Sequence, residues 1–488
     1  MVLTTIGDLV EQLNERNISY CHWKSNWALA ETLEGETDVD LLIDRRAAAE
    51  FRRVLRDLGF RPAIEAGVPA LPSVEHYHAL DGSGAIAHVH AYYRVISGES
   101  LSKNYHFPVE SMLLENRRFD GEIPIPTAGA ELVVFVLRML LKYTSPIELG
   151  LIMRDATALA REVEWLVSEE AIAEATSLLP TWIPQIDECL FHAGVDSLRP
   201  SGDTLQRIMV GLRVRRRLRG FARHNRLRAL GIEGQKFAQK TIYRLRGTKK
   251  KLTPGAGGMV IGFVGSEATG KSTLIGEVAS WLGKHYTIHR IHAGKPPFTA
   301  VTALPHILLP LMRTLLPRQR TTKVEARDAL KPGSLEGGFS LAFGVRAVML
   351  AYERRALLTR AYAQSSNGAI VLCDRYPSAG AGAPDSSQLS RYAPVRIGSL
   401  RQRLQDLEAR LYRDIPFPDQ VFHLSAPLDV TLARNRARDK FEPEPYVRLR
   451  HAKNEQIVFP GVAVNEIDTD RPLAAVIGEV KRRIWEGL

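Results

Sequence analysis

One short glycine-rich segment constrains the fold of this chain more than any other feature. Residues 265–272 read GSEATGKS and fit the Walker A pattern G-x-x-x-x-G-K-[ST]. An apolar run at 259–264 precedes the segment, and helical periodicity from 274 to 282 follows it. Glycines let successive backbone N–H groups turn toward an anion, and the start of the next helix adds its positive dipole end. The pattern therefore predicts a buried strand, a phosphate-binding loop and a helix.

The side chains of this loop predict an ATP site with Mg²⁺ as its cofactor. The Lys271 ammonium is expected to reach the β- and γ-phosphates, and the Ser272 hydroxyl is expected to bind Mg²⁺. The residues predicted to hold the nucleotide are Gly265, Ser266, Glu267, Ala268, Thr269, Gly270, Lys271, Ser272 and Thr273. Phosphoryl transfer from ATP to a small acceptor is the expected function of this part of the chain.

A second Mg²⁺-binding carboxylate is expected at the end of another apolar strand. Residues 369–373 form such a run, and Asp374, Arg375 and Tyr376 follow it directly. Asp374 can bind Mg²⁺ or its water, and Arg375 can neutralise phosphate charge during transfer. Asp374 and Arg375 therefore join Lys271 as predicted catalytic residues.

Arginines after a third apolar run complete the predicted catalytic set. The run at 420–424 precedes a predicted helix that carries Arg436 and Arg438 toward the segment 439–442. We predict that these two arginines close over ATP and stabilise charge on the transferred group. The alternative is that they belong to an ordinary basic helix face.

The length of the chain predicts more than one domain, because 488 residues exceed what one hydrophobic core normally serves. Charge, proline and glycine at 247–258 predict a linker. Before it we expect an α/β domain at 1–128 and a helical region with a basic segment at 129–246, and after it the P-loop domain at 259–488. The predicted fold class of the whole chain is α/β.

Composition and cysteine usage exclude several classes of protein. Hydrophobic residues make up 45% and charged residues 24%, which is typical of a globular protein and not of a disordered or integral membrane chain. Cys21, Cys189 and Cys373 lie far apart, so neither a disulfide framework nor a zinc site is expected. The N-terminus lacks a basic segment followed by an apolar core, so a signal peptide is not expected. A reducing cytoplasm is the expected location.

Two segments raise the question of a membrane surface. The net charge is +11, and residues 207–251 alone hold sixteen Lys/Arg and one acid, a charge of +15 that leaves −4 for the rest. This segment is either a solvated helix and linker, a surface for anionic membrane or lipid-linked substrate, or a nucleic-acid contact, although no clear nucleic-acid module accompanies it. The apolar stretch 301–317 is either a buried or pocket-capping helix or an interfacial membrane contact.

The motifs after residue 259 resemble the thymidylate kinase family of nucleoside-monophosphate kinases. Residues 263–272 are similar to the family's P-loop, with Glu267 matching an acid that lies near the acceptor. Residues 374–376 resemble its Asp-Arg-(Tyr/His) motif, Arg354 lies near the position of its acceptor-binding arginine, and 439–442 is similar to its lid. The resemblance implies a parallel sheet wrapped by helices, and dTMP or a related nucleotide as acceptor.

All departures from that family lie on the acceptor side. The family's Arg-Glu-Pro-Gly-Gly stretch is replaced by HAGKPP at 292–297, its thymine-stacking aromatic residue by Leu350, and 298–345 is an insert without counterpart. A sugar, glycan or lipid-linked acceptor therefore stays open, as in a bifunctional enzyme of surface-polysaccharide assembly. A nucleotide-sensing regulator that binds ATP without turnover is the other alternative. A homodimer is a further expectation.

The N-terminal domain resembles the nucleotidyltransferase fold. Residues 24–26 read KSN, and the following Asp38 and Asp40 alternate on one strand face, where both could reach one divalent metal ion. His88 stands where such enzymes usually have a third carboxylate. The domain is accordingly an active transferase, a degenerate binding or scaffold domain, or a different fold. For His88 and the nearby histidines, packing or hydrogen bonding is the alternative to metal binding.

Overall fold

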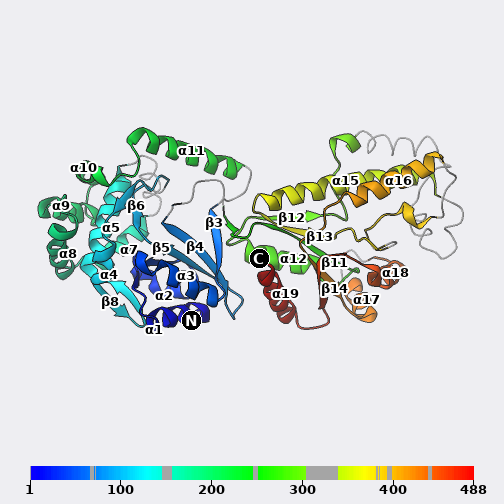
Figure 1. The fold of residues 1–488 in the computed structure, drawn as a ribbon, viewed down its shortest axis with the longest axis horizontal. Helices are drawn as coiled ribbons and strands as arrows, with labels where there is room; N and C mark the ends of the chain where they lie inside the picture. The colour runs from blue at the N-terminus through cyan, green and yellow to red at the C-terminus, as the bar shows by residue number, and fades with distance from the viewer. Residues whose placement is uncertain are drawn as a thin grey trace. The chain divides into compact units, whose positions relative to one another are not determined.

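The computed structural model describes residues 2–65, 71, 73–99, 101–144, 156–245, 251–303, 339–380, 383, 385–392, 398–437 and 442–488. The chain divides into two compact units, 1–250 and 251–488 (Figure 1). The division falls inside the glycine- and proline-containing stretch 247–258. We call these two parts unit 1 and unit 2.

Unit 1 contains a mixed sheet in which β2 is parallel to β5 and the neighbouring pairs are antiparallel. Its strands run in the order β1 (Tyr20–His22), β2 (Val39–Ile43), β5 (Ile86–Tyr92), β4 (Val74–Leu80) and β3 (Arg61–Glu65). Two further antiparallel pairs are β6 (Val95–Ser97) with β7 (Tyr105–Phe107) and β8 (Arg117–Asp120) with β9 (Ile123–Pro126). The helices of this part are α1 (Thr4–Glu15), α2 (Leu29–Leu33), α3 (Ala48–Asp57) and α4 (Glu110–Glu115). Apolar side chains of α1 and α3 pack with those of the sheet into one core.

Helix α5 (Ala128–Tyr143) joins this sheet to the helices that follow it in unit 1. Its side chains are apolar almost all the way round, which is typical of a helix buried on every side. The helices that follow are α7 (Ala156–Leu166), α8 (Glu169–Trp182), α9 (Glu188–Leu198), α10 (Thr204–Arg217) and α11 (Arg226–Leu245). Buried residues of α5 and α7 to α10 share one core with Trp23, Leu42 and Tyr92 of the sheet region. The helices and the strands of unit 1 are therefore one folded body.

Unit 2 is built on a fully parallel sheet. Its order is β12 (Ile288–His292), β13 (Ile370–Asp374), β11 (Met259–Gly265), β14 (Gln420–Ser425) and β15 (Ala463–Asp468). The helices around it are α12 (Lys271–Leu282), α15 (Leu341–Ser366), α16 (Leu400–Arg413), α17 (Leu428–Arg436), α18 (Glu444–Ala452) and α19 (Leu473–Gly487) (Figure 1). A parallel α/β sheet with the Walker A loop after its central strand is the arrangement of a P-loop kinase-like domain.

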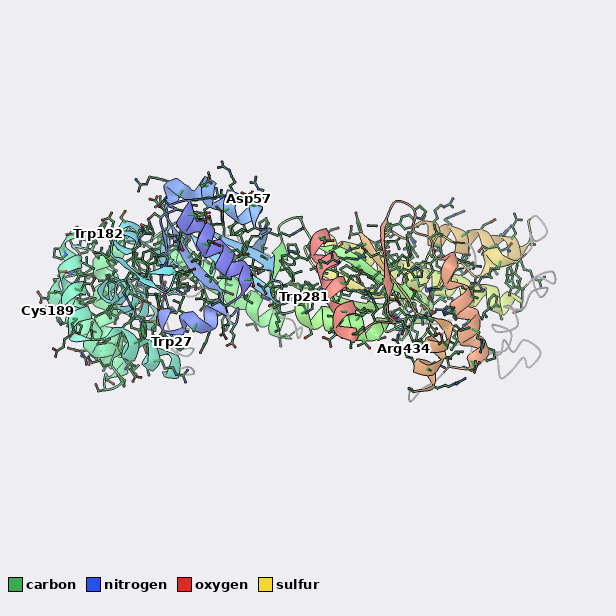
Figure 2. All side chains as sticks on the ribbon, turned by 90° about the horizontal axis from the view of Figure 1, so that it is seen from below. Trp27, Asp57, Trp182, Cys189, Trp281 and Arg434 are labelled. Carbon is green, nitrogen blue, oxygen red and sulfur yellow. The ribbon has the colours of Figure 1, made fainter. Side chains whose placement is uncertain are left out.

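The three central strands of the sheet of unit 2, β13, β11 and β14, are buried, whereas the edge strands β12 and β15 are more polar and partly exposed. Every residue of β11 is buried, as expected of a central parallel strand covered by helices. Helices α12 and α19 pack together, and the Lys481 ammonium lies 5.3 Å from the centre of the Trp281 ring near the end of α12 (Figure 2). Because the carboxyl ends of parallel strands meet at one edge, the loops after β11, β12 and β13 lie together there.

Among the described helices, none is long and apolar enough to cross a membrane. The apolar stretch 301–317 lies outside the described residues from residue 304 onward, so its predicted role as a buried helix or membrane contact stays a prediction.

Candidate functional site

The loop between β11 and α12 has the backbone shape that its glycines allow. Gly265 has φ +141° and Gly270 has φ +85°, both in regions that favour glycine, and Ala268 between them has φ +62°. A Cβ atom on Gly265 would lie 2.3 Å from the carbonyl oxygen of Leu424 on β14. The first residues of α12 have N–H groups without partners inside the helix, and they face the loop. This loop can therefore hold an anion with backbone N–H groups.

We predict that Gly265→Ala destabilises unit 2 by about 2 kcal/mol or more, because it forces both a strained φ and an overlap with the Leu424 carbonyl. The matched control is Gly276→Ala in α12, where no atom lies within 4 Å of a new Cβ. That change should stabilise the helix by about 0.5–1 kcal/mol. Hydrogen exchange of peptides from β11 and β14 measures both effects, and equal effects of the two substitutions would contradict the prediction.

Lys271 is buried inside the loop. Its side chain is 7% exposed, and Nζ donates to the carbonyl oxygen of Gly265 at 3.0 Å and to that of Ser266. Burial, and after it the charge of Arg375, lowers the pKa of Lys271 to about 8. The structure therefore places the one ammonium of the motif inside the loop, against its carbonyl oxygens.

Ser272 and Asp374 meet at the edge of the sheet. The parallel pairing of β11 with β13 sets Phe263 beside Asp374, and the Ser272 hydroxyl donates to Asp374 Oδ2 at 3.2 Å. Two oxygen ligands on one octahedral Mg²⁺ lie about 2.9 Å apart, given Mg–O distances of about 2.0–2.1 Å. The separation and the chemistry of the two oxygens therefore fit one shared magnesium ion.

Arg375 connects the loop to a second group of charges. Its Nη2 donates to both oxygens of Glu267, at 3.0 and 3.1 Å, and its Nη1 donates to Asp385 Oδ2 at 3.1 Å. Burial opposes the charge of Arg375, but Asp385 and Glu267 outweigh it and raise the pKa above its usual value. Arg375 also has φ +71°, uncommon for a residue with a side chain. The ion pairs hold the guanidinium beside the P-loop, on a residue whose backbone conformation is unfavourable.

Asp385 is the centre of this charge cluster. Its carboxylate accepts from Arg354 at 3.0 Å, from Arg375 at 3.1 Å and from Arg450 at 3.2 Å, and its side chain is 14% exposed. Burial would raise the pKa of Asp385, but the three arginines, led by Arg450, hold it well below its usual range. Arg450 Nε also lies 3.5 Å from Glu267 Oε1. Three cations and two carboxylates thus form one network.

Arg354, predicted from its position to bind the acceptor, lies inside this network. It is 3% exposed, and its Nε donates to the Ala293 carbonyl oxygen at 2.9 Å. Its Nη1 donates to the Tyr412 hydroxyl at 2.7 Å and to the Asp385 carbonyl oxygen at 2.9 Å. The guanidinium is therefore committed to the protein in this structure, and it positions Asp385.

Arg436, at the end of α17, lies apart from the network. Arg436 is 70% exposed and pairs with Glu444 at 3.0 Å. Arg438 lies outside the described residues, as do residues 439–441 of the predicted lid. Asn435 exchanges two hydrogen bonds with the backbone of Glu442, at 2.7 and 3.1 Å. The described structure therefore does not bring Arg436 to Lys271 or Asp374, and its catalytic role stays a prediction.

Two members of the network, Asp385 and Arg450, did not follow from the sequence. Asp385 follows the glycine- and alanine-rich run 378–383, where no pattern marks a carboxylate. Arg450 stands four residues after Tyr446 on α18, so the two side chains share one helix face, and the guanidinium lies 6.0 Å from the ring centre. That spacing is the one signal that could have identified Arg450.

In unit 1, the predicted metal-binding aspartates are already engaged by basic side chains. Asp40 Oδ1 lies 3.0 Å from Lys24 Nζ and 3.1 Å from His90 Nδ1. Asp38 Oδ1 lies 2.6 Å from His88 Nδ1. Burial would raise the pKa of Asp40, but Lys24 and His90 hold it well below its usual range. The nitrogen atoms around the two carboxylates do not match the oxygen ligands that Mg²⁺ prefers. The role of Asp38 and Asp40 as metal ligands stays a prediction.

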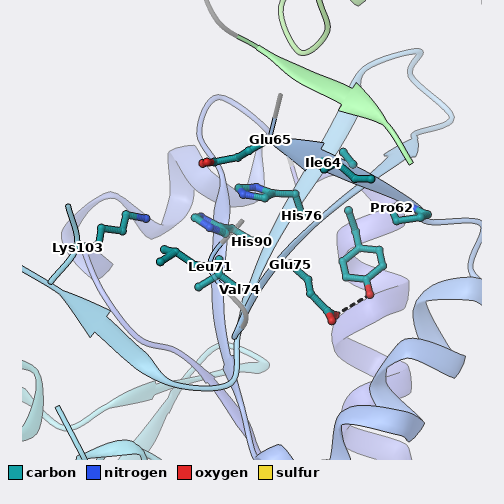
Figure 3. Close-up of a pocket in the computed structure, with 11 residues that line it drawn as sticks. Pro62, Ile64, Glu65, Leu71, Val74, Glu75, His76, His90 and Lys103 are labelled. Atoms are coloured by element: carbon teal, nitrogen blue, oxygen red, sulfur yellow. Dashed lines mark hydrogen bonds between the residues drawn. The ribbon is translucent and has the colours of Figure 1, made fainter. Parts of the chain in front are cut away.

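A pocket lies next to these residues. It has a volume of about 250 Å³, and His76, His90, Lys103 and Glu65 line it (Figure 3). The His76 and His90 rings stack with their centres 4.2 Å apart, and burial, followed by His90 and His88, lowers the pKa of His76 to about 3. His90 Nε2 is buried and has no hydrogen-bond partner among the described residues. The pocket is thus lined by neutral imidazole together with one ammonium and two carboxylates, those of Glu65 and Glu75.

A buried carboxyl group accepts hydrogen bonds from the segment 24–26. Glu131 on α5 is 4% exposed and accepts from the Asn26 backbone N–H at 3.3 Å and from its side-chain amide at 2.8 Å. Asn26 in turn bonds His22 Nδ1 at 2.6 Å. Burial raises the pKa of Glu131 from 4.5 to about 7. Glu131 therefore fixes the turn before the paired aspartates and takes up a proton near neutral pH.

We predict a pH-dependent effect of Glu131→Gln on the stability of unit 1. Folding raises the pKa of Glu131 to about 7, so the stability that this carboxyl contributes is complete below pH 4.5 and is lost as the pH rises through 7. The amide of the variant does not titrate. The free energy of unfolding of the variant, relative to that of wild type, should therefore rise by about 3 kcal/mol between pH 5 and pH 8. Denaturant unfolding at both pH values measures this gain. Glu164→Gln, at an exposed position of α7, is the control, and parallel stability curves for wild type and Glu131→Gln would contradict the prediction.

Comparison with known proteins adds two similarities. No protein-family model matches the chain. The uncharacterized ATP-binding protein YghR of Escherichia coli, from strain K12 and from O6:H1 strain CFT073, is 22% identical over 227 residues, which is 46% of this chain and 86% of the relative. A thymidylate kinase structure from Candida albicans, at 15% identity and a TM-score of 0.26, covers 47% of this chain and 90% of its own. Identity this low assigns no family.

Proposed function

We propose that unit 2 is an ATP-dependent phosphotransferase that moves the γ-phosphoryl group of Mg-ATP to a small acceptor. The observation that supports this most is the meeting of Lys271, Ser272 and Asp374 at the carboxyl edge of the parallel sheet. A buried ammonium, a row of helix N–H groups and two oxygen ligands are the parts that phosphoryl transfer from Mg-ATP needs. The relative that is named as ATP-binding adds support for the choice of nucleotide.

The roles of the residues follow from their positions. Lys271 and the loop N–H groups bind the β- and γ-phosphates, and Ser272 and Asp374 would hold Mg²⁺. The ion, when bound, neutralises charge on the phosphate oxygens. Arg375 lies beside the loop with its guanidinium fixed by Glu267 and Asp385, so it can stabilise the transferred group without reorganising. Positioning and charge neutralisation carry the rate, and no covalent intermediate is required.

We propose that the acceptor carries a phosphate group. Cations surround the site on the side of α18: Arg450 belongs to the network, and burial, followed by Arg391 and Arg450, lowers the pKa of Lys453 to about 8. Excess positive charge of this kind favours an anionic acceptor. By its resemblance to thymidylate kinases, unit 2 is expected to use dTMP or a related nucleotide, with Glu267 and the Arg354 network orienting it.

A sugar or lipid-linked acceptor is the second candidate, and two observations favour it. Leu350 stands where the related kinases have an aromatic residue for thymine, so stacking on the base is lost. Four of the five guanidinium N–H donors of Arg354 bond Ala293, Asp385 and Tyr412, so at most one is left for dTMP in this structure. We also propose that the chain has four parts. These are a nucleotidyltransferase-like part at 1–128, a helical part at 129–246, a linker at 247–258 and a kinase part at 259–488.

The test is transfer of labelled γ-phosphate from Mg-ATP to a panel of acceptors by the full chain. The panel holds dTMP, other nucleoside monophosphates, sugar phosphates and a polyprenyl phosphate in detergent. Labelling of dTMP supports the first candidate, and labelling of the saccharide or lipid arm alone supports the second. Tight ATP binding without labelling of any acceptor would replace both by a nucleotide-sensing regulator, and absence of ATP binding would overturn the proposal.

A further inference from the structure

A cavity in unit 1 is lined by an unusual concentration of arginines. It has a volume of about 620 Å³ and lies at the end of α10, the 3₁₀ turn η3 (Leu218–Phe221) and the start of α11. Its arginines are Arg215, Arg216, Arg219, Arg223 and Arg226, and no aspartate or glutamate among the described residues lines it. Volumes of about 300–1,000 Å³ are typical of small-molecule sites.

The walls of this cavity, which we call the arginine cavity, are held in place by other parts of unit 1. Arg215 pairs with the buried Glu99 at 3.1 Å and donates to the Thr144 hydroxyl at 2.9 Å. The Asn104 side chain accepts from the His224 backbone N–H at 2.9 Å and donates to the His224 carbonyl oxygen at 3.2 Å. Three separate segments therefore form a fixed concave surface, which a solvated helix face alone does not provide.

Within the described residues, a carboxylate balances only one of the five arginines of the cavity. Arg215 is neutralised by Glu99, and within the described part of the chain the other four arginines make no ion pair with a carboxylate. Arg223 is half-buried, its guanidinium donates to the Lys103 carbonyl oxygen at 3.2 Å, and burial lowers its pKa. Four uncompensated guanidinium groups that face one cavity repel each other unless an anion lies between them.

We propose that the arginine cavity binds a ligand that carries a diphosphate group. Guanidinium forks match phosphate oxygens in bidentate pairs, and they bind phosphate more specifically than ammonium does. A single phosphate group carries a charge of about −2 at most, whereas four free cations line the cavity, so two linked phosphates match the charge better. The start of α11 adds N–H groups beside Arg226, next to Asn225, whose side chain accepts from the Arg228 N–H at 2.9 Å. The diphosphate belongs either to a soluble metabolite or to a lipid head group.

The first experiment measures binding of inorganic pyrophosphate by calorimetry. It uses the full chain with Lys271→Ala, so that binding at the P-loop is weakened. We expect saturable binding at one site, weakened about tenfold or more by the double variant Arg219→Ala/Arg226→Ala at about 0.1 M salt. The control is Arg213→Ala/Arg228→Ala, which removes the same charge from exposed positions of α10 and α11 outside the cavity lining. It should change the affinity less than about threefold.

The second experiment separates the two sources of the diphosphate. Phosphatidylcholine vesicles with a small fraction of polyprenyl diphosphate are compared with vesicles of equal charge made with phosphatidylglycerol. Pyrophosphate binding, or co-sedimentation with the diphosphate vesicles alone, supports the proposal when the cavity variant loses it and the control variant keeps it. Equal losses in both variants, equal binding to both kinds of vesicle, or binding only of a single-stranded RNA oligonucleotide would overturn it.

Discussion

Replacing Lys271 by alanine should lower kcat for ATP-dependent phosphoryl transfer by about three orders of magnitude or more. The ammonium lies within the loop, where its charge is little screened by water and where the γ-phosphate of ATP would be bound. Its removal takes away a preorganised cation that acts most strongly on the charge of the transferred group. The measurement is single-turnover transfer of labelled γ-phosphate to the best acceptor of the panel.

The control for this experiment is Lys284→Ala. Lys284 is exposed and lies two residues beyond the end of α12, so its loss should change kcat less than about twofold. Far-ultraviolet circular dichroism and hydrogen exchange of β11 establish that both variants are folded. Transfer by Lys271→Ala at the wild-type rate would remove Lys271 from the proposed mechanism, and with it the principal support for the proposed function.

The P-loop site could be predicted in large part because its parts are local. The glycine spacing at 265–272 and the apolar runs before it and before Asp374 are properties of short segments, and parallel strands bring their carboxyl ends together without further information. Even the Ser272–Asp374 contact follows from the pairing of β11 with β13. Local patterns of this kind are where a sequence is most informative.

The arginine network could not be predicted because its members are far apart in sequence. Asp385 gains its role only when α15 brings Arg354, the loop after β13 brings Arg375 and α18 brings Arg450 to the same point. The resemblance to thymidylate kinases implies that Arg354 lies at the acceptor, but a resemblance in spacing does not show which groups its donors meet. Its burial against Ala293 and Tyr412 depends on tertiary packing.

For the paired aspartates of unit 1, too, the sequence predicts the local arrangement but not the tertiary contacts. Strand alternation places Asp38 and Asp40 on one face, which the sequence indicates directly. Which side chains oppose them depends on the register of β2 with β5, where Asp40 stands beside His90, and on the antiparallel register of β4, which adds His76. A one-residue shift in either register would place other side chains there, and sequence patterns do not specify register that closely.

The Asp385 network predicts a large loss of stability from a small change. Asp385→Asn keeps the shape of the side chain but removes the charge that three buried or half-buried guanidinium groups share. Removing one partner of a buried ion pair typically costs about 3–5 kcal/mol, because the remaining charges are left without compensation. We expect the free energy of unfolding of unit 2 to fall by that amount, and hydrogen exchange of β11 and β13 peptides measures it.

The pH dependence and a second substitution distinguish this network from ordinary surface pairing. Because the arginines hold the pKa of Asp385 below its usual range, its stabilisation is complete above about pH 4–5 and is lost as the pH falls through the lower folded-state pKa. The difference between wild type and Asp385→Asn should therefore be constant from about pH 6 to 8 and should narrow in acid. Asp414, 43% exposed and 3.7 Å from Arg355, is the control, and Asp414→Asn should cost less than about 1 kcal/mol at every pH. Equal losses from Asp385→Asn and Asp414→Asn would show that the network contributes no more than a surface ion pair.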